Sequence, residues 1–145
     1  MRAIEDWHAS AIKAAYASGD KDWKGTAVFS MGFVPGFDAE ILEALKSADR
    51  EVHIQAIVAA GRQEVDAAWP YVTELIQNPD TEKPPLLAAI AAAGYIRPKQ
   101  AGEVLIDLYD SPDEDIAEAA AEAMGMGAAL SGGLDEEEPG DNWVN

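Results

Sequence analysis

The chain has 145 residues, and 10 Lys and Arg residues against 27 Asp and Glu residues give a formal net charge of −17. A negative field of this size repels phosphate backbones and anionic lipid, so nucleic acid and membrane surfaces are excluded as expected partners. A basic protein partner, or a role of the charge in solubility alone, is compatible with it. Cysteine is absent, which excludes disulfides and thiolate metal sites.

The composition favours an all-helical fold. Apolar residues are 48% of the chain and many of them are alanine, the residue with the best helix propensity. Runs of valine, threonine and aromatic residues with strand-like alternation are missing. No stretch approaches the roughly 20 apolar residues that cross a bilayer, and the start "MRAIEDWH" lacks a signal-peptide core, so we expect a cytoplasmic protein.

In chain order, helical segments of two types are expected to alternate. The first type carries apolar residues at helical spacing and ends in a short polar turn; its members are "DWHASAIKAAYAS", "FDAEILEALKS", "AAWPYVTELIQN" and "PKQAGEVLIDLYD". The second type ends at a glycine; its members are "DWKGTAVFSMG", "EVHIQAIVAAG", "KPPLLAAIAAAG" and "DIAEAAAEAMG". The pairs predict four helical hairpins, at about 4–32, 38–61, 67–94 and 99–125.

The second type of segment repeats in a common register. The glycines are Gly32, Gly61, Gly94 and Gly125, and the residue five before each is alanine: Ala27, Ala56, Ala89 and Ala120. The positions nine, five and one before the glycine lie on one helix face, which is predicted to be buried. The residue nine before the glycine is Trp23, Val52, Pro85 or Ile116. The small alanine predicts close approach of a neighbouring helix.

The ends of these helices have their own signals. Each glycine is interpreted as a left-handed residue at the helix C-terminus, where glycine has no Cβ penalty. Asp20, Asp49 and Asp113 stand twelve residues before their glycines and are predicted to cap the N-termini. The third segment has Glu82 at that place, followed by Pro84 near the helix start.

A hairpin of about 31 residues cannot bury its own apolar face, so the hairpins are expected to stack into a solenoid. The segments "DREVHIQAIVAAG" and "DKDWKGTAVFSMG" resemble HEAT repeats of the short type named after phycobilisome lyases, and the resemblance covers about residues 4–130. It implies an all-α, right-handed α-solenoid. We expect one repeat domain over 1–130 and an acidic tail over 131–145 that its composition predicts to be disordered.

The resemblance also implies that the glycine-ended helices line the concave side. Positions seven and three before the glycine are apolar in three repeats where water is expected. With Lys24 and His53, which hold the basic position of the repeat, they form the candidate binding surface: Lys24, Phe29, His53, Ile54, Val58, Leu87 and Ala91. The alternative is that adjacent helices cover these side chains.

Two further surfaces are expected from the ends of the chain. Trp143 in "NWVN" is a candidate anchor for a groove of its own chain or of a neighbour, with a free end as the alternative. The first helix carries Ile4, Trp7, Ile12 and Tyr16 with no preceding repeat to cover them, which suggests end-to-end self-association.

Catalytic and metal-binding residues are not predicted. His8 and His53 lie 45 residues apart, and neither has a second histidine at metal-ligand spacing. "DKDWKG" resembles the opening of a calcium loop, but Lys24 and Met31 stand where oxygen ligands are required. No Ser/His/Asp set or phosphate-binding glycine loop is present. The expected protein is not an enzyme and has no metal or cofactor.

The sequence thus favours a non-catalytic scaffold that binds a protein or peptide across the concave face of an acidic solenoid. The alternative is a bilin lyase-like enzyme or a chaperone for a tetrapyrrole, which the name of the repeat type suggests and which would need basic groups for the propionates. A HEAT-like DNA glycosylase would need a basic concave face, which the net charge opposes.

Overall fold

The computed structural model describes the backbone of residues 2–131 and the side chains of residues 8–20 and 22–125. Within the described residues every regular element is a helix, as the composition predicts. The elements are α1 (Arg2–Tyr16), α2 (Lys21–Met31), α3 (Asp38–Ala44), α4 (Arg50–Arg62), the 3-10 helix η1 (Asp66–Ala68), α5 (Trp69–Gln77), α6 (Lys83–Ile96), α7 (Pro98–Tyr109) and α8 (Glu114–Ser131).

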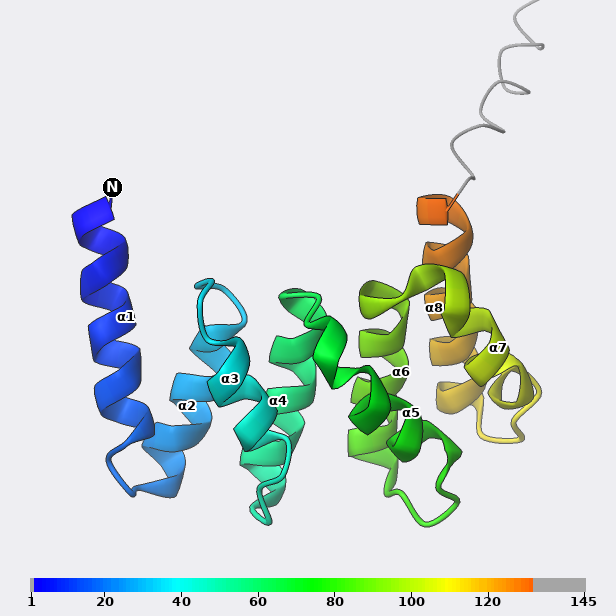
Figure 1. The fold of residues 1–145 in the computed structure, drawn as a ribbon. Coiled ribbons are helices and arrows are strands. Elements are labelled where there is room, and N and C mark those ends of the chain that lie inside the picture. Colours follow the sequence, from blue (N-terminus) through cyan, green and yellow to red (C-terminus); the bar gives the residue numbers. More distant parts are fainter. Residues whose placement is uncertain (1, 132–145) are drawn as a thin grey trace, which may run out of the picture.

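The helices form two layers (Figure 1). Helices α2, α4, α6 and α8 stand side by side in one row, and each packs against the next. The shorter layer consists of α3, α5 and α7, which pack on α4, α6 and α8, while α1 packs on α2 at the N-terminal end. We call α2, α4, α6 and α8 the inner helices. The predicted α-solenoid is confirmed.

Small and branched apolar side chains fill the space between the inner helices. The four repeated alanines, from Ala27 to Ala120, are at most 2% exposed. Trp23 departs from the predicted buried face, because its side chain is 60% exposed whereas Val52 and Pro85 at the same repeat position are buried. A site that accommodates valine or proline has no room for an indole, so the larger side chain lies outside.

The repeat glycines do not end their helices in a left-handed conformation, so that prediction was wrong. Gly32 has φ −71° and ψ −14°, and the other three glycines lie inside α4, α6 and α8. A Cβ added at Gly61 would lie 3.0 Å from the Cα of Ala92, and one added at Gly32 would lie 3.3 Å from the Cα of Ala59. These glycines therefore allow the next inner helix to approach closely.

The predicted N-caps are confirmed, and a turn residue supports each of them. Asp20 accepts hydrogen bonds from the backbone N–H groups of its own helix, and so do Asp49 and Asp113. The hydroxyl group two residues earlier, from Ser18, Ser47 or Ser111, accepts a hydrogen bond from the backbone N–H of the capping aspartate; the N···O distances are 3.2, 3.0 and 3.1 Å. The turn Ser-x-Asp therefore orients the cap before the helix begins. Glu82 makes no such cap.

The N-terminal helix is tied to the repeats by its second half. Ile12 is buried, and the Tyr16 hydroxyl donates a hydrogen bond of 2.7 Å to the carboxylate of Glu43 in the last turn of α3. Burial and this carboxylate raise the pKa of Tyr16 far above its ordinary value. Two of the four side chains that the sequence suggested as uncovered are thus engaged within the chain. The side chains of Ile4 and Trp7 lie outside the described ones, so self-association stays a prediction.

Ion pairs connect successive inner helices at their N-terminal ends. Arg50 Nε on α4 lies 3.3 Å from Glu82 Oε1, and Lys83 Nζ on α6 lies 3.0 Å from Asp113 Oδ2 and 2.8 Å from Asp115 Oδ2. In both repeats the base is the first residue of the inner helix, directly after the N-cap position, and not the repeat position of Lys24 and His53. A basic residue at the start of an inner helix is therefore the sequence feature that accompanies these ion pairs.

The Lys83 contacts predict a pH-dependent contribution to stability. The Lys83 ammonium group lowers the pKa of Asp113 below its ordinary value of 3.8, with help from the backbone N–H groups of Ile116 and Asp115. A lowered folded-state pKa stabilises the fold above pH 3.8, and the contribution disappears as the pH falls through the lowered pKa. Lys83→Met should therefore lower the urea midpoint at neutral pH, and the difference from wild type should vanish in strong acid.

Lys99→Met is the matched control for this prediction, because Lys99 is also exposed on a helix first turn and forms no ion pair with another described residue. It should leave the pH profile of the urea midpoint parallel to that of wild type. A Lys83→Met profile that also stays parallel to wild type down to low pH would contradict the role of the ion pair.

Candidate interaction surface

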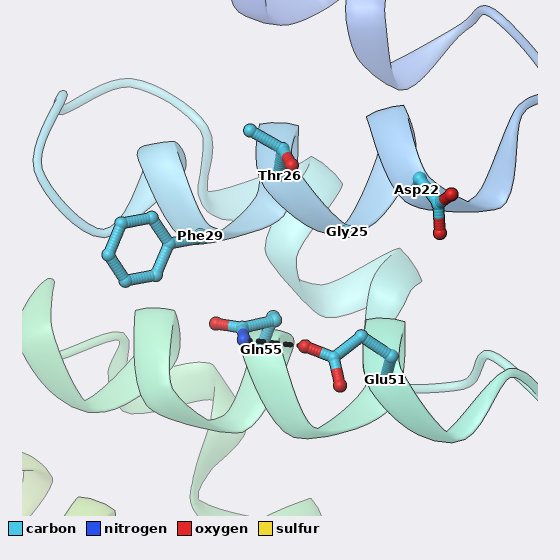
Figure 2. Close-up of a pocket in the computed structure, with 6 residues that line it drawn as sticks. All are labelled: Asp22, Gly25, Thr26, Phe29, Glu51 and Gln55. Atoms are coloured by element: carbon cyan, nitrogen blue, oxygen red, sulfur yellow. Dashed lines mark hydrogen bonds between the residues drawn. The ribbon is translucent and has the colours of Figure 1, made fainter.

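The side of the inner helices that α3, α5 and α7 leave uncovered forms one surface, which we call the inner face. It has a hollow between each pair of neighbouring helices from α2 to α8. The α2/α4 hollow (about 350 Å³) is lined by Asp22, Gly25, Thr26, Phe29, Glu51 and Gln55 (Figure 2). The α4/α6 hollow (about 200 Å³) includes Val58, Arg62, Ala88, Ala91 and Tyr95, and the α6/α8 hollow (about 780 Å³) includes Leu87, Ala91, Asp115, Glu118 and Glu122.

Five of the predicted binding residues lie on this face. Phe29, Val58 and Leu87 each line one of the three hollows, Ala91 lines two of them, and Phe29 is 43% exposed. Ile54 is half-buried on α4, one turn before Val58. The apolar positions seven and three before the glycine are thus only partly covered by adjacent helices.

The two predicted basic residues lie elsewhere. The ammonium group of Lys24 lies 4.9 Å from the ring centroid of Tyr16 on α1 and lines none of the three hollows. His53 is half-buried, and burial lowers its pKa below the ordinary value of 6.5, so its imidazole is neutral at neutral pH. Neither residue supplies a cation to the inner face. The predicted anchor Trp143 lies outside the described residues.

An aromatic cluster with one arginine was missed by the sequence reasoning. The rings of Phe29 and Phe33 meet edge to face at 5.2 Å, and the Arg62 guanidinium carbon lies 4.4 Å from the Phe33 centroid and 5.4 Å from that of Phe29. Phe33, Arg62 and Tyr95 each directly follow a repeat glycine. The sequence shows this regularity. It was missed because the glycine was interpreted as the end of the helix, so the residue after it was not considered part of the helix face.

Charge divides the inner face along the solenoid. The α2/α4 hollow holds the carboxylates of Asp22 and Glu51, and Glu51 accepts a hydrogen bond of 2.8 Å from the Gln55 amide (Figure 2). In the α6/α8 hollow, Asp115 is paired with Lys83, whereas Glu118 and Glu122 pair with no cation among the described residues. The α4/α6 hollow between them carries the single cation Arg62.

The described residues present no group of three or more His, Cys, Asp or Glu side chains that could hold a metal ion. None of the described helices has the length and apolar character needed to cross a membrane.

Comparison with known proteins identifies the repeat. The model of the family described as HEAT repeats matches residues 38–125, which is more than half of the chain. No curated protein shows significant similarity to the chain. HEAT repeats generally act as scaffolds in protein–protein interaction and are typically not enzymes. With the row of inner helices, this match shows that the chain belongs to the HEAT-repeat family.

Proposed function

We propose that the chain is a non-catalytic scaffold that binds a protein or peptide segment, preferably a basic one, across its inner face. The observation that carries this proposal is the row of three hollows over α2, α4, α6 and α8: each offers apolar or aromatic side chains, and the two outer ones also offer carboxylates. An extended surface of this kind is what stacked repeats use for binding.

The aromatic cluster gives this surface a place where binding energy can concentrate. Aromatic and arginine side chains dominate interface hot spots, because they offer large contact area at a low entropic cost. Phe33 is 60% and Tyr95 46% exposed, so both can become buried when a partner binds. Burial of apolar surface contributes about 25 cal/mol per Å². The carboxylates on either side favour basic residues and speed up their association.

The proposal is tested with peptides selected from a displayed random library on the wild-type protein. The double variant Ile54→Glu/Leu87→Glu places two charges on the apolar part of the inner face. We expect the selected peptides to bind this variant at least about tenfold more weakly, which corresponds to about 1.4 kcal/mol. Affinity is measured by fluorescence anisotropy, and circular dichroism confirms that the variant is folded.

Because Ile54 and Leu87 are half-buried, a second variant protects the test against a loss of folding. Phe33→Ser/Tyr95→Ser removes two exposed rings, one that contacts Phe29 and Arg62 and one that lines the α4/α6 hollow. Ile106→Ser/Tyr109→Ser removes two similarly exposed side chains from α7 in the other layer. The first should lose peptide affinity and the second should retain it. A library that yields no binder, or binders that both variants retain equally, would refute the scaffold proposal.

A further inference from the structure

The three hollows of the inner face differ in a way that selects among ligands. The outer two carry carboxylates, from Asp22 and Glu51 in the first and from Glu118 and Glu122 in the third. The middle hollow has an apolar lining and the cation of Arg62. A basic side chain is therefore attracted at both ends of the row and repelled at its centre.

The middle hollow has the size for one bulky apolar side chain. Its volume is about 200 Å³, and it is lined by Val58, Ala91 and Tyr95. A cavity of about 150 Å³ with an apolar lining is enough to bind benzene. Arg62 stays compatible with an apolar ligand there, because its guanidinium group lies over the Phe33 ring and does not need a new counter-ion from the ligand.

The hollows also differ in their position along the helices. The residues that line the outer hollows begin in the first turns of α2, α4 and α8, at Asp22, Glu51 and Asp115. The middle hollow extends to the last turns of α4 and α6, at Arg62 and Tyr95. The unpaired carboxylates Glu118 and Glu122, in the second and third turns of α8, also lie nearer the N-terminus of their helix than Arg62 and Tyr95 do in theirs. A segment that crosses the helices therefore directs its basic side chains toward the helix N-termini and its apolar side chain toward the C-termini.

The spacing fits an extended strand. Packed helices lie about 8–10 Å apart, so the first and third hollows, two helix spacings apart, are separated by about 16–20 Å. A strand rises about 3.3 Å per residue, so about six residues cover this distance. Side chains alternate along a strand, so its first and seventh residues share a side while the fourth points to the opposite side.

From these observations we infer that the partner segment is an extended peptide with two basic residues about six positions apart and a bulky apolar residue midway, basic-x-x-apolar-x-x-basic. The inference rests on the proposed scaffold function and specifies its ligand. The first basic residue is held by Asp22 and Glu51, the apolar residue enters the hollow beside Tyr95, and the second basic residue is held by Glu118 and Glu122.

The test uses two fluorescein-labelled peptides of equal composition, Lys-Thr-Thr-Leu-Thr-Thr-Lys and Lys-Thr-Leu-Thr-Thr-Thr-Lys. The second moves leucine to the same side as the lysines. We expect the first to bind at least about fivefold more tightly, because only in the first can the leucine enter the middle hollow while both lysines reach carboxylates. Glu118→Gln/Glu122→Gln should weaken the first peptide by about two- to fivefold, and added salt should reduce this effect.

Glu103→Gln/Asp107→Asn is the matched control, since it removes two exposed carboxylates four residues apart on α7 in the other layer. It should leave affinity unchanged. Equal binding of the two peptides, no binding of either, or an unaltered affinity of Glu118→Gln/Glu122→Gln would overturn the inferred pattern. The scaffold proposal would survive each of these results as long as library-selected peptides still depend on Phe33 and Tyr95.

Discussion

Gly61→Val is expected to lower the free energy of unfolding by about 3 kcal/mol, because added volume at a close-packed helix crossing forces the backbones apart. A Cβ at this position lies 3.0 Å from the Cα of Ala92 and 3.2 Å from its Cβ. The Cα belongs to the backbone of α6, so the contact cannot be relieved by a rotamer change. Gly61→Ala should lie between wild type and valine, since its single methyl group meets the same contact but gains helix propensity.

Gly125→Ala is the control, because Gly125 holds the same repeat position in α8 and an added Cβ meets nothing within 4 Å. This substitution should raise the free energy of unfolding by up to about 1 kcal/mol through helix propensity alone. Urea unfolding followed by circular dichroism measures both changes. If Gly61→Val proved as stable as wild type, the glycine would not be needed for the approach of α4 and α6.

The contrast between these two glycines explains what the sequence could and could not predict. The period of about 31 residues is visible in the spacing of Ala27, Ala56, Ala89 and Ala120, and helix geometry places these alanines on the buried face. The solenoid was therefore predictable from the sequence. The role of Gly61 depends on how near α6 stands, and a distance between two segments is not present in the periodicity of either. The interpretation of the glycine as a left-handed residue at a helix end used only local information, and it was wrong.

The same reason limits the prediction of the candidate surface. Phe29, Val58, Leu87 and Ala91 were found because their positions on one helix are set by that helix. The stacking of Arg62 on Phe33 joins α4 to the turn after α2, and the pairing of Lys83 with Asp113 joins α6 to the cap of α8. Contacts between repeats require the placement of neighbouring repeats, which one sequence without its structure does not contain.

Substitutions on two faces of α4 are expected to affect stability and binding differently. Ile57 is completely buried, whereas Ile54, three residues earlier, is half-buried on the inner face. Ile57→Ala should lower the free energy of unfolding by about 2–4 kcal/mol, because it leaves a cavity in the core that cannot fully collapse. Ile54→Ala should cost less than about 1 kcal/mol, since a partly exposed side chain loses less burial.

Binding should respond in the opposite order if the inner face is the scaffold surface. Ile54→Ala removes contact area that a bound segment would cover, so peptide affinity is expected to fall although the protein stays folded. Ile57→Ala should leave the affinity of the folded molecules nearly unchanged at temperatures well below its lowered midpoint, because its side chain reaches no partner. Urea unfolding and anisotropy on the same two samples give both quantities. A loss of affinity that followed the loss of stability, larger for Ile57→Ala than for Ile54→Ala, would mean that binding depends on the integrity of the solenoid and not on this face.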